Sequence, residues 1–315
     1  MKGASMNPKW VDLQINGRVG LSFTDEGLTQ EDVLKMTEVL AADGTAAYLP
    51  TIVTCPDAVA LKNLRTIAAA RSKYPECAKR ILGVHMEGPF ISPVDGYRGA
   101  HRLDCVVPPS YDLYSRWQEA SGGLVKMVTL AAEAEGAVDF TRKVTSEGVV
   151  VSLGHMTASM PEEISPLAEA GARAFTHFGN GMPSRIDRHR NVFWTGLLED
   201  RLTLMFIPDG FHLPKALLHA YVKLISLNRL VAVSDCAYPG GLPPGRYEQN
   251  GLVSVLEPNG FLRCGDTELL SGSSCTLSDA VKVLMSKEVG LTESECEIVA
   301  RENPLRLIGM EGWEE

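Results

Sequence analysis

The run Val149-Val150-Val151-Ser152-Leu153-Gly154 is apolar almost throughout and is followed directly by His155. Three other apolar runs also end directly before a polar residue: Arg80–Met86 before Glu87, Ala172–Thr176 before His177, and Leu230–Ser234 before Asp235. Near-continuous apolar runs of this length are typical of parallel strands that are covered on both faces. In a closed parallel barrel, the carboxyl ends of the strands meet at one mouth. We therefore expect these four polar residues to lie together.

Strand-like runs alternate with helix-like segments along the whole chain. The eight strand candidates are Trp10–Ile15, Ala46–Val53, Arg80–Met86, Val125–Leu130, Val149–Gly154, Ala172–Thr176, Leu202–Ile207 and Leu230–Ser234. Apolar residues recur at intervals of three and four in Thr29–Asp43, Pro56–Lys73, Tyr111–Ala120, Gly136–Glu147, Met160–Ala170 and Pro214–Ser226. Eight alternating units predict an α/β fold, a (β/α)8 barrel of the TIM type. An open, doubly wound sheet is the alternative, because periodicity does not tell whether the first and last strands meet.

Residues with special backbone preferences support these boundaries. Pro161 and Pro214 suit the first turn of a helix, and a glycine falls where three of the helices would end, at Gly44, Gly148 and Gly171. After the eighth strand, the Gly- and Pro-rich loop Tyr238–Tyr247 leads to an expected hairpin that turns at Pro258-Asn259-Gly260. Two terminal helices, about Ser278–Lys287 and Thr292–Ile308, would close the barrel. No linker interrupts this order, so we expect a single domain over residues 1–315.

The composition is that of a globular protein with a large core, since 45% of the 315 residues are hydrophobic and 22% are charged. The net charge is −9 and the Lys and Arg residues are dispersed, which argues against binding to nucleic acid or to an anionic membrane. Residues 1–9 lack the apolar core of a signal peptide, and no apolar run is long enough to span a membrane. We expect a cytoplasmic protein that acts on a small molecule.

The seven cysteines are scattered and form no Cys-x-x-Cys pair. This predicts reduced thiols rather than a zinc knuckle or a redox motif. Cys236 follows Asp235 directly, but a buried thiol is inert unless its surroundings activate it, so we expect a packing residue.

Glu87, His155 and His177 are the predicted ligands of a divalent metal ion. Taken singly, a Glu at a strand end is equally well explained as a solvated carboxylate, and a His as a hydrogen-bonded packing residue. Together, two imidazoles and one carboxylate from three strand ends leave a fourth coordination position open, which is typical of catalytic zinc. Asp235 would either cap the turn after its strand or, beside a metal-activated water, act as the general base and acid of a hydrolase.

A series of motifs in fixed order connects the chain with a known family. They are Asp12-Leu13-Gln14-Ile15-Asn16-Gly17, His85-Met86-Glu87-Gly88-Pro89, Gly99-Ala100-His101, Gly154-His155, Thr176-His177-x-x-Asn180-x-Met182-Pro183, Asp209-Gly210-x-His212, Val233-Ser234-Asp235 and Ser271-Gly272-Ser273-Ser274. Over roughly Trp10 to Gly309, the chain resembles the N-acetylglucosamine-6-phosphate deacetylase family of the amidohydrolase superfamily.

The resemblance implies a distorted (β/α)8 barrel that removes an acetyl group from an amino sugar phosphate. It implies that the three ligands hold one divalent metal ion, most often zinc, and that Asp235 is the general base and acid. It also implies that His101 polarises the acetamide carbonyl and that Asn180 and His212 contact the sugar.

Other amidohydrolases carry His-x-His on the first strand for a second metal. Gln14 and Asn16 stand there in this chain, and neutral amides are poor zinc ligands, which favours a single metal ion.

The chain departs from the family pattern in three places. The small β-sandwich domain of the family has no counterpart, so we expect a barrel alone, with surface left free for a homodimer interface. The loop from Glu87 to His101 is slightly longer than usual, and His101 is followed by Arg102-Leu103 instead of Asn-Pro. The phosphate-binding stretch is replaced by Ser184–Arg190. Arg188 or Arg190 would bind phosphate there, in this or a neighbouring subunit, and a solvated basic loop is the alternative.

These observations predict a metal-dependent amidohydrolase that removes the N-acetyl group of N-acetylglucosamine 6-phosphate or a close relative, giving acetate and the free amine. An amidohydrolase that acts on another N-acyl compound, a lactone or a cyclic amide is the main alternative, because the Arg185–Arg190 loop is altered. A non-catalytic sugar-binding barrel is the less favoured reading. Aldolase chemistry would require a Schiff-base Lys at a strand end, whereas Lys126 lies near the start of its strand.

Overall fold

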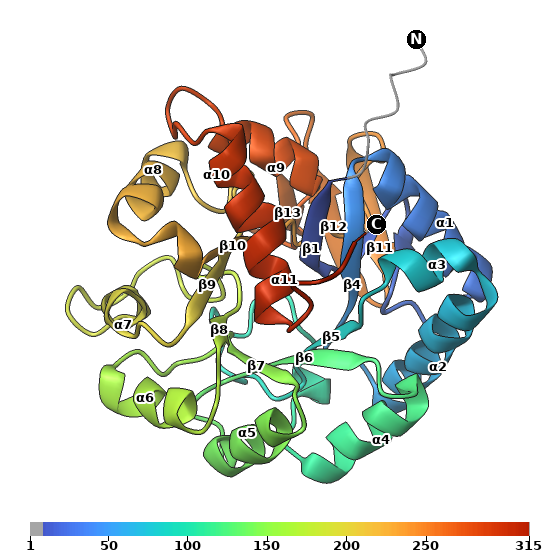
Figure 1. The fold of residues 1–315 in the computed structure, drawn as a ribbon, viewed down its shortest axis with the longest axis horizontal. Coiled ribbons are helices and arrows are strands. Elements are labelled where there is room, and N and C mark those ends of the chain that lie inside the picture. The colour runs from blue at the N-terminus through green and yellow to red at the C-terminus, as the bar shows by residue number, and fades with distance from the viewer. Residues whose placement is uncertain (1–8, 315) are drawn as a thin grey trace.

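The computed structural model describes residues 9–314 and has eight parallel strands at its centre (Figure 1). These strands are β1 (Trp10–Ile15), β4 (Thr45–Val53), β5 (Val84–Glu87), β6 (Val125–Leu130), β7 (Val150–Leu153), β8 (Ala174–Phe175), β9 (Thr203–Phe206) and β10 (Leu230–Ala232). Each strand pairs in parallel with the next one in this order. The predicted set of eight strands is confirmed.

The first and last strands are joined just beyond the end of β10. The Asp235 amide donates a hydrogen bond of 2.9 Å to the Gln14 carbonyl, and the Asn16 amide donates one of 2.8 Å to the Cys236 carbonyl. A parallel bridge between Ile15 and Cys236 lies at the same place. The sheet therefore closes into a barrel, and the alternative of an open, doubly wound sheet is wrong.

Helices surround the strands on the outside (Figure 1). They are α1 (Gln30–Ala42), α2 (Asp57–Lys73), α3 (Pro75–Arg80), α4 (Tyr111–Ser121), α5 (Ala137–Ser146), α6 (Pro161–Glu169), α7 (Val192–Leu198), α8 (Lys215–Leu224), α9 (Leu277–Leu284), α10 (Glu293–Glu297) and α11 (Asn303–Leu307). Short 3₁₀ turns form η1 (Leu103–Cys105) and η2 (Leu227–Arg229), and η3 (Ile298–Glu302) is π-helical.

The expected boundary residues lie at the ends of these helices. Pro161 is the first residue of α6, and Pro214 directly precedes α8. Gly44, Gly148 and Gly171 follow α1, α5 and α6 with φ values of 95°, 81° and 115°. Only glycine adopts this region without strain, which explains why these helices end where they do.

The floor of the barrel is closed by the C-terminal helix. Val11 and Leu13 of β1 point into the barrel and form a buried cluster with inward residues of the other strands, and Leu305 and Ile308 belong to the same cluster. Asn303 donates hydrogen bonds of 2.7 Å to the carbonyls of Leu227 and Leu230, where β10 begins. The strands therefore start at a sealed end, and the opposite end is the mouth.

Three details of the prediction are wrong. The run Arg80–Met86 is continuous strand only from Val84, because Arg80 is the last residue of α3 and Ile81 makes just an isolated parallel bridge with Tyr48. Helix α7 (Val192–Leu198) was not predicted. The terminal segment Thr292–Ile308 is not one α-helix, since the π-helical turn η3 separates α10 from α11.

The described residues contain five strands outside the barrel. β2 (Gly17–Arg18) and β3 (Leu21–Ser22) form a small pair, and β11 (Gly245–Gln249), β12 (Leu252–Leu256) and β13 (Leu262–Cys264) form an antiparallel sheet. The expected hairpin with its turn at Pro258-Asn259-Gly260 is β12–β13, so that part of the prediction is confirmed. The third strand of this antiparallel sheet, β11, was not predicted.

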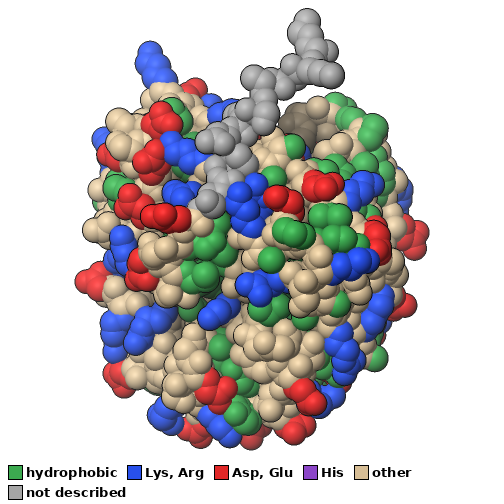
Figure 2. All heavy atoms as spheres, turned by 45° about the vertical axis from the view of Figure 1, so that its right-hand side comes forward, with side chains coloured by type: hydrophobic (Ala, Val, Ile, Leu, Met, Phe, Trp, Pro, Cys, Tyr) green, Lys and Arg blue, Asp and Glu red, His purple; other side chains and the backbone are tan. Residues whose placement is uncertain are grey.

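Charged side chains of both signs are interspersed on the face that Figure 2 shows, in keeping with the dispersed Lys and Arg residues of the sequence. None of the helices between residues 9 and 314 combines the length and the apolar character that crossing a membrane requires.

Candidate metal centre and active site

The four residues singled out in the sequence lie at the mouth, where their strands end. Glu87 is the last residue of β5, and His155, His177 and Asp235 follow β7, β8 and β10 within three residues. The last three have φ values of 49°, 31° and 50°, in the left-handed region that non-glycine residues rarely adopt. Such strain costs roughly 1–3 kcal/mol per residue and is concentrated at functional sites. The left-handed backbone at these three residues makes the chain turn sharply where each strand ends.

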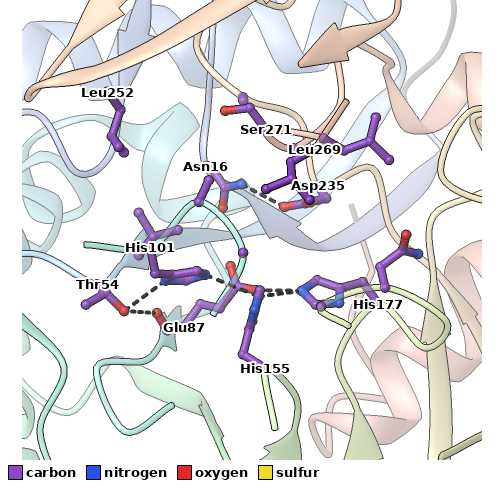
Figure 3. A pocket seen from close by; sticks show the side chains of 18 of the residues that line it. Asn16, Thr54, Glu87, His101, His155, His177, Asp235, Leu252, Leu269 and Ser271 are labelled. Carbon is purple, nitrogen blue, oxygen red and sulfur yellow. Dashed lines mark hydrogen bonds and ion pairs between the residues drawn. The ribbon is translucent and has the colours of Figure 1, made fainter. Parts of the chain in front are cut away.

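Glu87, His155 and His177 converge on one point, as predicted (Figure 3). His177 Nε2 lies 3.0 Å from Glu87 Oε1 and 2.9 Å from His155 Nε2, and His155 Nε2 lies 3.4 Å from Glu87 Oε1. The three side chains are almost fully buried, and one ligand atom from each lies within 4.8 Å of the others.

This donor set suits a divalent cation. Burial alone would raise the pKa of Glu87, but the neighbouring imidazoles of His155 and His177 hold this pKa well below its ordinary value, so the carboxylate is charged. His155 Nδ1 lies 2.8 Å from the Tyr97 carbonyl, which can only accept, and this leaves the Nε2 lone pair of a neutral ring for a metal. Two nitrogens and one anionic oxygen that point at the same space are a ligand set that suits a divalent metal ion.

Asp235 stands beside this cluster, with Asn16 next to it (Figure 3). Asn16 Nδ2 and Gln14 Nε2 both donate to Asp235 Oδ1, at 2.7 and 3.2 Å, and Gln14 Nε2 also lies 3.0 Å from Glu87 Oε1. Burial, together with the charge of Glu87, raises the pKa of Asp235 to about 7. A carboxyl group with a pKa near neutrality can both accept and return a proton. The sequence suggested Gln14 and Asn16 only as substitutes for metal ligands, whereas the structure also shows them orienting Asp235.

His101 reaches the cluster from the loop that follows β5. Its Nε2 lies 3.2 Å from His155 Nε2, and its Nδ1 lies 2.8 Å from the hydroxyl of Thr54, at the end of β4. Burial lowers the pKa of His101 to about 3, and the neighbouring His155 adds to this effect. His101 thus lies where the resemblance suggested, despite the longer loop. Thr54 was not singled out in the sequence, because nothing local to β4 indicates a contact 47 residues away.

An open cavity of about 530 Å³ leads from these side chains to the surface. Asn180 and His212, the expected sugar contacts, both line it. Asp209 fixes His212 by accepting its backbone amide at 2.8 Å and by lying 2.7 Å from its Nδ1. Leu252 and Leu269, from the sheet β11–β13 and the loop behind it, line the wall beyond His101 and Asp235 (Figure 3).

Arg188 and Arg190, the expected phosphate ligands, are exposed and do not line this cavity. Arg102 is the single Lys or Arg among the described lining residues, and two hydrogen bonds of 3.1 and 2.7 Å tie it to Asp104. Arg190, however, lines a smaller neighbouring pocket that His155 and Asn180 also line.

Cys236 is buried and makes no contact with the metal cluster that the structure records. Burial raises the pKa of its thiol to about 11, and Arg18 Nη1 lies 3.6 Å from its Sγ. It is an uncharged packing residue, as expected. The seven cysteines all have free thiols.

No family model matches the chain. It is 33% identical over 279 residues to N-acetylglucosamine-6-phosphate deacetylase of Bacillus subtilis, covering 87% of this chain and 68% of that protein. It is 28% identical over 311 residues to N-acetylgalactosamine-6-phosphate deacetylase of Escherichia coli, covering 97% of this chain and 78% of that protein.

Solved structures agree with these relatives. A mutant N-acetyl-D-glucosamine-6-phosphate deacetylase of Mycobacterium smegmatis, in complex with N-acetyl-D-glucosamine-6-phosphate, superposes with a TM-score of 0.86 at 27% identity, covering 96% of this chain and 77% of that chain. With a closed barrel, a buried Glu-His-His cluster and relatives of this similarity, the chain belongs to the N-acetylglucosamine-6-phosphate deacetylase family of amidohydrolases.

Proposed function

We propose that this protein is a metal-dependent deacetylase of N-acetylated amino sugars, with N-acetylglucosamine 6-phosphate or a close relative as its substrate. The observation that carries the proposal is the convergence of Glu87, His155 and His177 at the barrel mouth, with Asp235 beside them in the same cavity. The names and substrate complex of the relatives support the choice of substrate.

One divalent cation, zinc in our proposal, would be held by Glu87, His155 and His177. When bound, it supplies the positive charge that polarises a carbonyl and acidifies a water molecule. Zinc is favoured because a tetrahedral site with two imidazoles and one carboxylate is among its common catalytic arrangements.

The remaining steps belong to side chains of this chain. Asp235 takes a proton from the attacking water, whose oxygen forms a bond to the acetyl carbon. His101 donates a hydrogen bond to the carbonyl oxygen as negative charge develops there. Asp235 then returns the proton to the nitrogen as the carbon–nitrogen bond breaks, so that acetate and a free amine leave.

Recognition of the substrate falls to other residues of the cavity. Asn180 and His212 would contact the sugar, since both line the cavity and Asn180 Nδ2 has no partner among the described residues.

We propose that Arg188 or Arg190 binds phosphate in a neighbouring copy, which requires a homodimer. Sedimentation velocity of the purified protein checks this, and a monomer at working concentration would exclude it.

A second candidate is an unphosphorylated N-acyl substrate. The observation in its favour is that Arg102, already paired with Asp104, is the single cationic side chain among the described cavity residues besides histidines, while Glu26 and Glu268 lie on the lining. An acidic rim disfavours a phosphate unless a cation comes from elsewhere.

One screen tests both candidates. The metal-loaded protein is incubated with N-acetylglucosamine, N-acetylgalactosamine and the 6-phosphate of each, and released acetate is measured. Release from a 6-phosphate at a kcat/KM at least about tenfold above that of the free sugar supports the first proposal. The reverse order supports the second, and no release from any of them excludes the first and restricts the second to N-acyl compounds other than these sugars. We further propose that residues 1–315 act as one domain and that the reaction takes place in the cytoplasm.

A further inference from the structure

Thr54 is a buried threonine that lies beside the active site without contacting the metal ligands' side chains. It follows β4 directly, is 3% exposed, and its hydroxyl oxygen lies 2.8 Å from His101 Nδ1 (Figure 3). A longer contact of 3.5 Å leads from the same hydroxyl to the backbone carbonyl of Glu87. A Cβ on Gly88 would lie 2.3 Å from the Thr54 oxygen, so only a glycine leaves room for the hydroxyl in this position.

The proposed function and the contacts of the two ring nitrogens together locate the proton on His101. The Tyr97 carbonyl can only accept, so His155 Nδ1 carries a hydrogen and His155 Nε2 is a bare lone pair. That lone pair is kept for the metal ion, so the contact of 3.2 Å between His101 Nε2 and His155 Nε2 does not place the His101 hydrogen, whereas the proposed function requires this hydrogen on His101 Nε2. In a neutral ring, Nδ1 must then accept. The donor available to it is the Thr54 hydroxyl, at 2.8 Å.

We propose that Thr54 is a positioning residue that fixes the tautomer and the ring orientation of His101, so that the Nε2 hydrogen faces the substrate carbonyl. The inference rests on the proposed function, in which His101 stabilises the developing oxyanion. A ring with the opposite tautomer would present a lone pair to that oxygen and would repel it.

The competing arrangement is weaker. If Thr54 donated to the Glu87 carbonyl instead, His101 Nδ1 would be the donor in the 2.8 Å contact with Thr54, and His101 Nε2 would present a lone pair to the substrate carbonyl oxygen. The only hydrogen bond that Thr54 would then donate is 3.5 Å long, at the limit of useful length.

Substitution separates the hydroxyl from the shape of the side chain. Thr54→Val keeps the shape and removes the donor, whereas Thr54→Ser keeps the donor. We expect Thr54→Val to lower kcat about 10- to 100-fold, comparable to the loss of one oxyanion donor, with KM within about threefold of the parent. Thr54→Ser should recover kcat to within about threefold of the parent. Metal content should be unchanged in both.

Thr51→Val is the matched control. Thr51 is a fully buried threonine of the same strand, and its hydroxyl accepts the Ile15 amide at 3.1 Å without contacting His101. We expect it to reduce stability and leave kcat near the parent value. A similar loss of kcat in Thr51→Val and Thr54→Val would show a general effect of hydroxyl removal and overturn the proposal.

The tautomer of His101 can be measured directly, without following the reaction. In protein labelled with ¹⁵N-histidine, the nitrogen shifts of His101, assigned with a His101→Gln variant, should show a hydrogen on Nε2 in the parent and in Thr54→Ser, and loss of this preference in Thr54→Val. A hydrogen on Nδ1 in the parent would overturn the proposal. If His101→Gln retains the parent kcat, the assumed role of His101 fails as well. If His101→Gln loses activity but Thr54→Val retains the parent kcat, the proposed function stands and only the role given to Thr54 is wrong.

Discussion

Asp235 receives both of its recorded side-chain hydrogen bonds on Oδ1, from Asn16 and Gln14. Asp235→Asn removes the proton acceptor while keeping the size of the side chain, and asparagine tolerates the positive φ of 50° at this position. We expect unchanged metal content and a loss of roughly 100- to 10,000-fold in kcat, the usual contribution of a general base. Elemental analysis and acetate release measure both. Turnover at the parent rate would refute the role given to Asp235.

Asn16→Ala tests the hydrogen bond of 2.7 Å to Asp235 Oδ1. A hydrogen bond to a charged group contributes roughly 1.5–3 kcal/mol, so we expect kcat to fall about tenfold or more as Asp235 becomes less well oriented. KM and metal content should stay close to the parent values, because Asn16 does not contact the three ligands. A loss of metal in this variant would instead mean that Asn16 supports the metal site directly.

The sequence was sufficient to predict Glu87, His155, His177 and Asp235, because each directly follows a recognisable strand. It was not sufficient for Thr54 or for the Tyr97 carbonyl. Their roles depend on contacts across 47 and 58 positions of the chain. No local pattern indicates such contacts. Every residue has a backbone carbonyl, so nothing in the sequence marks the one of Tyr97 as a partner of His155.

At the scale of the elements, β5 to β8 carry a chain of buried polar groups inside the barrel. His85 Nε2 lies 2.7 Å from the Thr129 hydroxyl, which lies 2.7 Å from that of Thr176, and Ser152 continues the chain at 2.6 Å. Burial lowers the pKa of His85 from 6.5 to about 4. Between these two values the unfolded chain binds a proton that the folded barrel does not. His85 therefore removes stability as the pH falls through this window.

His85→Gln should abolish this dependence. Asp12 acts in the opposite direction, since burial raises its pKa to about 7, so the parent protein alone does not isolate the effect. We expect the difference in unfolding free energy between parent and variant to shrink by about 2 kcal/mol from pH 7 to pH 5, at 1.36 kcal/mol per pKa unit. Urea unfolding at each pH gives the values, and a difference independent of pH would contradict the assignment.

Element boundaries show where sequence patterns fail. The apolar pair Ile81-Leu82 before β5 resembles a strand and does contact Tyr48 of β4, but only through an isolated bridge. Arg80, which the prediction placed in the strand, ends the short helix that Pro75 begins. Helix α7 has only seven residues and was hidden by the polar loop before it. Strand β11 became recognisable only through its pairing with β12, which places Gln249 opposite Leu252 across a short turn.

At the scale of the whole molecule, one cation would connect three strands, β5, β7 and β8. A ligand that binds only the folded state stabilises it by about 4 kcal/mol when its free concentration is 1,000 times Kd. We therefore expect chelation to lower Tm by several degrees and abolish acetate release, and zinc to restore both. Thermal unfolding with and without chelator measures this. An unchanged Tm after the metal is shown to be removed would mean that the cluster is already rigid without it.

The sealed floor has a practical consequence. β1 begins at Trp10 on that side, and Trp313 packs against the cluster of Leu305 and Ile308 there. Both ends of the described chain thus emerge away from the opening through which a sugar would enter. An affinity handle, a fused reporter or a bead attached at either end should leave diffusion into the catalytic chamber unhindered, so immobilised protein should retain the KM of the free form.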